Sequence, residues 1–243
     1  MRDYLLDIVK YNKGIGNIKM VKLISDENET RLEARADESV VVSARYKTAI
    51  PGLTGTLGIG NLDALQTITS IREYDENAKI TVTTKTDAEG NEFPFTINFE
   101  NSSGDFKNVF RLMTEKTVSE QIKSVRFKGA SWDVEFEPSQ IDIQRFKYQS
   151  VANSEETVFL AKTVNGDLKF FFGDGSGNTG DFVFKSQVKG ELTQGWRYPV
   201  TEFLNALNLP GKITMKFSDQ GAAIIEVDND LAVYEYIFPA QTK

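Results

Sequence analysis

Short runs of β-branched and aromatic residues, many of them alternating between apolar and polar side chains, recur along this chain at close spacing. Turns rich in Gly, Asn and Asp separate several runs, as at residues 87–91 and 228–230. Strands this near in sequence pair antiparallel, because a parallel pair needs a crossover of about a dozen residues or more. The runs that we expect to be strands are 38–46, 78–84, 93–99, 157–161, 167–172, 181–184, 212–217, 222–227 and 231–238.

Four segments have the apolar spacing of helices, at residues 2–11, 62–71, 139–151 and 199–209. Asn61 is a good N-cap for the second helix, and Pro199 suits the first position of the fourth. Each half of the chain therefore has the order helix, strands, helix, strands.

A short sequence echo supports a duplication. Residues 79–82 (Lys-Ile-Thr-Val) follow the second helix, and residues 212–215 (Lys-Ile-Thr-Met) follow the fourth. The echo falls at the same point of two matching element orders, which is the pattern of an internal repeat. We expect two similar α+β domains, 1–110 and 111–243, with a connector at about 102–120.

Composition restricts the chemistry. The chain has no Cys and no His, which removes thiol catalysis, thiolate metal sites and the commonest general base. The net charge of −7 argues against a protein that coats nucleic acid non-specifically, although basic residues gathered on one inner face would still attract it. With no apolar run near ~18 residues and no signal-peptide pattern, we expect a cytoplasmic protein that does not enter a membrane.

Three motifs that could carry chemistry have simpler explanations. Residues 173–181 resemble an acidic calcium loop but lack its sixth-position Gly and twelfth-position Glu, so they predict a β-hairpin turn. Residues 55–60 are glycine-rich without the Lys-Ser/Thr of a phosphate loop, and we expect a flexible lead-in to the second helix. Glu135 and Glu137 alternate with apolar residues, which indicates a solvated strand face rather than a carboxylate-based hydrolase. We therefore expect no catalytic residues, metal or cofactor.

The end of the chain, residues 221–241, resembles the closing strands of the DNA sliding clamps, with a Tyr-x-x-Pro element at residues 236–239. Residues 57–65 resemble the lead into the second helix of the clamps of T-even-type bacteriophages. The repeated element order is similar to this family, including the proliferating cell nuclear antigen fold, over essentially the whole chain.

The resemblance implies a homotrimeric ring with antiparallel sheets outside and two helices per domain lining a central channel. Such a processivity factor encircles duplex DNA without sequence preference and tethers the replicative polymerase. The main alternative is a non-enzymatic phage structural protein of a tail or capsid. A phage-encoded clamp would act in the cytoplasm of the infected host cell.

The resemblance also predicts two sets of site residues. Several cations lie at or near helix ends, where ordinary helix electrostatics is the alternative explanation. The predicted DNA-facing residues are Lys10, Lys13, Arg72, Lys79, Arg145, Lys147 and Lys212.

The second set is a groove between the domains, under the connector, for short hydrophobic peptides of the polymerase and the clamp loader. Plain core packing is the alternative for these side chains. The predicted groove residues are Val41, Phe106, Phe110, Leu112, Met113, Ala222, Tyr236, Phe238 and Pro239.

Overall fold

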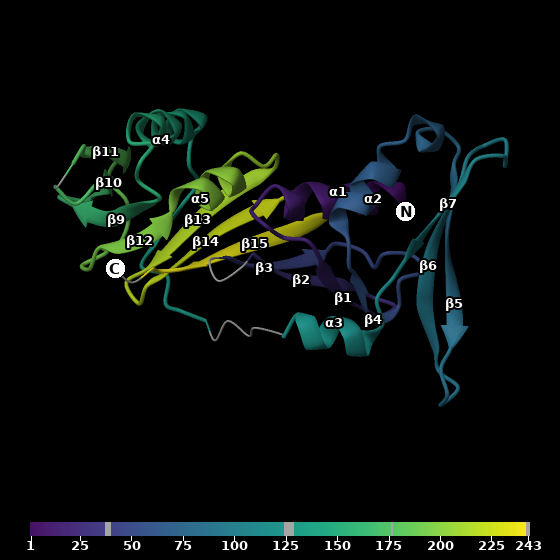
Figure 1. Cartoon of the computed structure of the whole chain (residues 1–243). Helices are drawn as coiled ribbons and strands as arrows, with labels where there is room; N and C mark the ends of the chain where they lie inside the picture. Colours follow the sequence, from purple (N-terminus) through teal and green to yellow (C-terminus); the bar gives the residue numbers. More distant parts are fainter. Residues whose placement is uncertain (37–39, 124–128, 176, 242–243) are drawn as a thin grey trace. The chain divides into compact units, whose positions relative to one another are not determined.

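The computed structural model describes residues 1–36, 40–123, 129–175 and 177–241. The chain forms two compact units (Figure 1). The first comprises residues 1–35, 42–125 and 231–233, and the second comprises 36–41, 126–230 and 234–243. Both contain helices and sheets, and the strand pairs whose register is described are antiparallel. The predicted α+β class is confirmed.

The first unit opens with α1 (Arg2–Lys13), followed by strands in the order β4-β1-β2-β3. These are β1 (Val21–Ser25), β2 (Thr30–Ala36), β3 (Val40–Tyr46) and β4 (Gly55–Ile59). Helix α2 (Leu62–Thr69) and a 3-10 turn (Arg72–Tyr74) lead into the sheet β5-β6-β7. Its strands are β5 (Lys79–Thr86), β6 (Glu92–Glu100) and β7 (Lys107–Arg111), and α3 (Glu115–Gln121) follows them.

The second unit starts with β8 (Val134–Phe136) and α4 (Gln140–Ala152). Four strands then form a sheet in the order β11-β10-β9-β12, with bounds β9 (Val158–Val164), β10 (Asp167–Phe172), β11 (Gly180–Lys185) and β12 (Trp196–Pro199). After α5 (Val200–Leu207) come β13 (Lys212–Ser218), β14 (Ala222–Asp228) and β15 (Ala232–Pro239), in the order β15-β14-β13-β8.

The two units share one chain path. Each runs helix, four strands, helix, three strands. Within each set of four strands, the first lies between the second and the fourth, which is the Greek-key order. The last three strands of each unit lie side by side in sequence order. The extra elements are the 3-10 turn after α2 and α3 after β7 in the first unit, and β8 before α4 in the second.

Alternation between buried and exposed residues explains the strands. The burial of β2 alternates along its length, as expected when one face packs on a core and the other meets solvent. The helices follow the same logic, with Leu5 and Ile8 of α1 and Ile143 and Phe146 of α4 buried one turn apart. Helix α1 packs against α2 in the first unit, and α4 packs against α5 in the second.

Several sequence expectations need correction. Residues 55–60 are not a flexible lead-in, because they contain β4, which pairs with β1. Pro199 is the N-cap of α5 rather than its first helical residue, and α1 extends to Lys13. The connector holds an unexpected helix, α3, and unexpected strands form at β1, β2, β7, β8 and β12. Residues 38–39 of one predicted strand and residue 176 of the predicted hairpin turn lie outside the described residues.

Glycine in β4 permits a close approach rather than flexibility. A Cβ on Gly58 would lie 2.7 Å from Cγ2 of Val118 in α3, and one on Gly60 would lie 2.6 Å from Sδ of Met113. Gly58 and Met113 also exchange backbone hydrogen bonds of 3.0 and 2.7 Å. The connector therefore packs directly on β4, on the face opposite Leu57 and Ile59.

Candidate functional site

The predicted DNA-facing cations of the first unit have different surroundings. Lys10 on α1, Arg72 in the 3-10 turn and Lys79 at the start of β5 are exposed. Lys13 is partly exposed and forms an ion pair of 2.6 Å with Asp63 of α2, and it also donates a hydrogen bond to Gln66. Part of the charge of Lys13 is therefore balanced within the helix pair.

In the second unit, Arg145 and Lys147 are exposed on α4, and the Arg145 guanidinium lies 5.6 Å from the ring centre of Phe182 on β11. Lys212, at the start of β13, forms an ion pair of 2.6 Å with Glu137. The hydrogen bond and charge of Glu137 raise the pKa of Lys212 above its ordinary 10.5. Lys212 is thus engaged by a carboxylate, which weakens its prediction as a DNA contact.

Charge is distributed unevenly over the chain. Helices α1, α2, α4 and α5 together contain five basic and five acidic residues, so they carry no net charge. The whole −7 charge of the chain therefore resides outside these four helices. Because phosphates are repelled by negative surfaces, the four helices together are less unfavourable to a nucleic acid than the rest of the chain taken as a whole.

Most predicted groove residues are buried. Tyr236 and Phe238 are fully buried, and Phe238 packs on Phe203 with ring centres 4.7 Å apart. The residues that reach the surface, wholly or in part, are Val41, Phe106, Met113 and Pro239. Those that lie in a core are Phe110, Leu112, Ala222, Tyr236 and Phe238.

A pocket lies beside the connector in the first unit. Its volume is about 590 Å³, and its apolar lining includes Leu57, Phe93 and Met113. Polar groups at its rim come from the turn between β5 and β6 and from the start of α3, among them Asp87, Asn91 and Lys116. Met113 is the predicted groove residue that lines this pocket. The residues of β4 and of the β5–β6 hairpin were not predicted as site residues, because no sequence pattern places them beside the connector.

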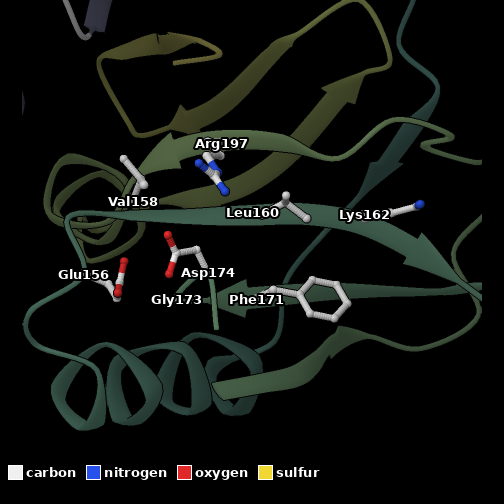
Figure 2. Close-up of a pocket in the computed structure, with 8 residues that line it drawn as sticks. All are labelled: Glu156, Val158, Leu160, Lys162, Phe171, Gly173, Asp174 and Arg197. Atoms are coloured by element: carbon white, nitrogen blue, oxygen red, sulfur yellow. The ribbon is translucent and has the colours of Figure 1, made fainter. Parts of the chain in front are cut away.

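Figure 2 shows a second hollow, of about 500 Å³, in the second unit. Leu160 and Phe171 form an apolar floor on one face of β9 and β10. Glu156 and Asp174 lie toward one end, and Lys162 and Arg197 complete the lining. The mixture suits an amphipathic side chain, with both signs of charge around an apolar floor.

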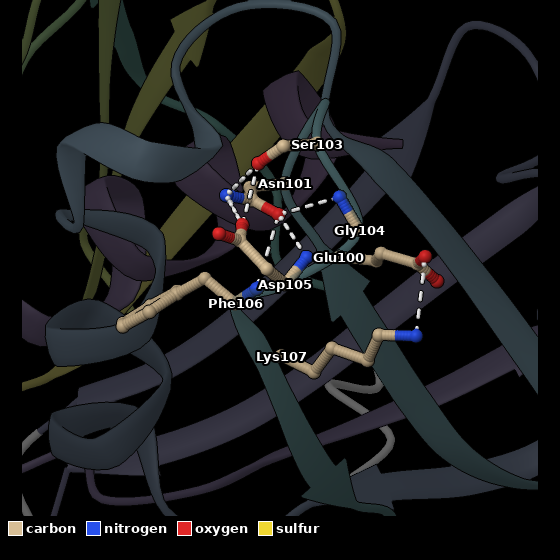
Figure 3. Close-up of polar contacts among 7 residues, drawn as sticks. All are labelled: Glu100, Asn101, Ser103, Gly104, Asp105, Phe106 and Lys107. Carbon is tan, nitrogen blue, oxygen red and sulfur yellow. Dashed lines mark hydrogen bonds and ion pairs between the residues drawn. The ribbon is translucent and has the colours of Figure 1, made fainter.

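The loop between β6 and β7 contains a dense set of polar contacts (Figure 3). The Asn101 side-chain oxygen accepts hydrogen bonds from the backbone N–H groups of Gly104, Asp105 and Phe106. Its amide donates to Ser103 and Asp105, both at 2.9 Å. Hydrogen bonds from Ser103 and Asn101 lower the pKa of Asp105 below its ordinary 3.8. This arrangement fixes the turn, and its groups satisfy one another.

The structure shows what surrounds the acidic motifs at residues 173–181 and at Glu135 and Glu137. The segment from residue 173 joins β10 to its antiparallel neighbour β11, as a hairpin requires. Glu135 and Glu137 are exposed and face lysines, with Glu135 3.8 Å from Lys216. Among the described residues, no three Asp or Glu side chains are grouped as a metal site would need, and no helix has the length and apolar character to cross a membrane.

Exposed large apolar residues form a feature that the sequence reasoning missed. They fall in two places: Phe106 and Val109 at β7 of the first unit, and Ile141, Tyr148 and Val151 on α4 of the second. Tyr148 is 65% exposed and Val109 is 63% exposed. The spacing of the α4 residues was visible in the sequence, since it puts them off the helix face that carries Ile143 and Phe146.

Comparison of the chain with models of known protein families, and with curated proteins, finds no match.

Proposed function

We propose that this chain is a subunit of a DNA sliding clamp, a trimeric ring that encircles duplex DNA and tethers a polymerase. The observation that carries the proposal is the repeated chain path. Both units run helix, four Greek-key strands, helix, three strands, with the same strand order in each. A ring of three such chains would contain six like units and would surround the duplex evenly.

The charge distribution fits this role. A closed ring stays on DNA because it encircles the duplex, so its channel needs little attraction for the phosphates. The ring also slides faster when this attraction is weak. Helices with no net charge, carrying exposed Lys10, Arg145 and Lys147, would line the channel. The negative charge elsewhere would keep DNA off the outer surface.

Ring closure would use the two exposed apolar surfaces. Strand β7 is the last strand of its sheet, and β11 is the last strand of its own sheet, beside α4. Pairing β7 of one copy with β11 of the next would extend both sheets and cover Val109 together with Ile141 and Tyr148. The two surfaces lie in different units, so the contact is head-to-tail and closes by rotation.

Partner binding would use the pocket beside the connector. Partly exposed Phe93 and Met113 offer an apolar site for one or two side chains of a short peptide from the polymerase or the clamp loader. Exposed Pro239 and half-exposed Val41 remain candidates of the predicted groove.

The chain has no cysteine, which permits a clean test of the ring. Paired substitutions, one on β7 (Val109→Cys) and one on β11 (Asp181→Cys or Val183→Cys), place a thiol on each proposed edge. Oxidation should join three chains into one covalent species, whereas either single variant should remain as single chains, because its thiol faces an edge without cysteine. When the paired variant is loaded by its clamp loader onto nicked circular DNA and is oxidised afterwards, the joined ring should stay bound in high salt and dissociate when the circle is cut.

An open ladder of products, or binding that is indifferent to cutting the circle, would instead favour a tail or capsid component. The size of the cross-linked products and their response to cutting the circle therefore separate the two candidate functions.

A further inference from the structure

The two units differ at the outer edge of their three-stranded sheets. In the second unit, β8 pairs antiparallel with β13, with Phe136 opposite Met215 and Val134 opposite Phe217. In the first unit, β5 occupies the position of β13, and it is the terminal strand of its sheet among the described residues. The edge that β8 covers in one unit is therefore open in the other.

The sequence echo gives the correspondence along these strands. Lys79 matches Lys212, so Val82, Thr83 and Thr84 match Met215, Lys216 and Phe217. Met215 and Phe217 are fully buried, whereas Val82 is half-buried and Thr84 is exposed. The side chains of β5 are thus more exposed than those of β13, as expected for a strand that has no neighbour in the position of β8.

β5 is well suited to bind a strand. It is eight residues long, and six of its residues are Thr, Ile or Val, which favour extended backbone. It contains no Pro, and an exposed edge of this kind presents backbone N–H and C=O groups that an extended segment can pair with.

β8 shows what chemistry such a segment has. Val134 is fully buried, and the Phe136 ring stacks near the Phe217 ring with centres 6.4 Å apart. The residues between and after them are acidic: Glu135 lies 3.8 Å from Lys216, and Glu137 lies 2.6 Å from Lys212. Apolar side chains alternate with glutamates that pair with lysines of the receiving strand.

β5 offers one of the two matching charges and a second lysine nearby. Lys79, the counterpart of Lys212, is exposed at one end of the strand, whereas Thr83 stands where the second unit has Lys216. Lys85 is exposed toward the other end, with its ammonium 3.8 Å from the ring centre of Phe95. Half-buried Ile80 and Val82 lie between them and would receive the apolar side chains. The charge at this edge is complementary to an acidic segment and unfavourable to a basic one.

We propose that the free edge of β5 binds an extended acidic segment of a partner protein, which adds a fourth strand to the β5-β6-β7 sheet. The segment would run antiparallel to β5 and would alternate apolar residues with Glu or Asp. This docking site belongs to the first unit alone and does not depend on ring formation.

The probe is a capped peptide with the sequence of residues 131–138, Ser-Trp-Asp-Val-Glu-Phe-Glu-Pro. Titrated into the isotope-labelled full chain, it should shift the backbone amide signals of residues 79–86 and slow their hydrogen exchange. Lys79→Glu should weaken binding about fivefold, because an attractive cross-strand pair becomes repulsive. A peptide with both Glu residues replaced by Lys should bind more weakly than the parent peptide.

Lys19→Glu is the matched control, since it makes the same charge change at an exposed residue of the same unit. It should leave the affinity within twofold of the unsubstituted chain. The proposal is overturned if the peptide shows no binding at about 1 mM. It is also overturned if the signals of β13 move instead of those of β5, because the peptide would then be displacing β8, or if Lys79→Glu and Lys19→Glu behave alike.

Discussion

The first and second units follow one chain path with different interiors. The first packs mainly aliphatic side chains, including Leu5, Leu23 and Leu57, which are all buried. The second is built around Phe146 of α4, whose ring centre lies 4.9 Å from that of Phe159 and 5.2 Å from that of Phe170. The comparison teaches that the spacing of apolar positions and the turns specify this path, whereas the identity of the core residues is free to change.

The largest expected effect tests the aromatic core. Phe146→Ala removes the ring on which six strand and helix aromatics converge and should cost about 3–5 kcal/mol of unfolding free energy. Gln144→Ala, two residues before Phe146 on the exposed side of the same helix, should change this free energy by about 0.5 kcal/mol or less. Denaturant titration of both variants measures the difference, and equal losses would refute the assigned core.

The connector gives the next test, because the units differ in what covers the outer face of their four-stranded sheets. In the first unit α3 packs on β4 through Gly58, whereas in the second the hollow of Figure 2 lies over β9 and β10. Gly58→Ala should cost about 1–3 kcal/mol, since its Cβ would lie 2.7 Å from Val118.

Val118→Ala in the same chain should recover part of the Gly58→Ala loss, and additive losses would contradict the packing. Gly177→Ala, which has no atom within 4 Å of the added Cβ, is the neutral control.

A smaller loss should follow from the turn between β6 and β7. Asn101→Ala removes the acceptor of three backbone N–H groups and should cost about 1–2 kcal/mol. Asn91→Ala, at the exposed turn between β5 and β6, should cost less than this. Thermal unfolding compares the two variants, and the reverse ranking would contradict the structural role of Asn101.

The smallest expected effect is a titration. The pKa of Asp105 is lower in the folded chain than its ordinary 3.8, chiefly because of the hydrogen bond from Ser103. The resulting stabilisation is present above about pH 4 and is lost as the pH falls through the folded pKa. Ser103→Ala should raise the Asp105 pKa toward 3.8 in a carboxyl NMR titration, and an unchanged value would show that another group holds it down.

Sequence patterns predicted the elements with regular periodicity. Helix α4 and the N-cap Asn61 of α2 could be predicted, because apolar spacing and capping chemistry are local. Ser139, the N-cap of α4, was instead counted as the first residue of that helix. β4 escaped prediction because Gly58 serves a contact with a segment more than fifty residues away. The order of strands in each sheet is likewise a long-range property that no local pattern carries.

The candidate site was less predictable than the fold. Cations such as Lys10 and Arg145 could be predicted to be exposed from their positions near helix ends or on helix faces. The partners of Lys13 and Lys212 could not, because Asp63 and Glu137 lie far from them in sequence. Tyr236 and Phe238 fit a strand pattern, but only the packed unit shows that both are fully buried.

The central claim is a closed ring of three chains, and the most direct measurement is the mass of the purified chain by size-exclusion chromatography with light scattering. The account predicts three times the chain mass of 27.2 kDa, falling to one chain when Val109→Glu places a charge on the exposed apolar surface of β7. A single chain at all concentrations, or an assembly of other symmetry that is insensitive to Val109→Glu, would contradict it.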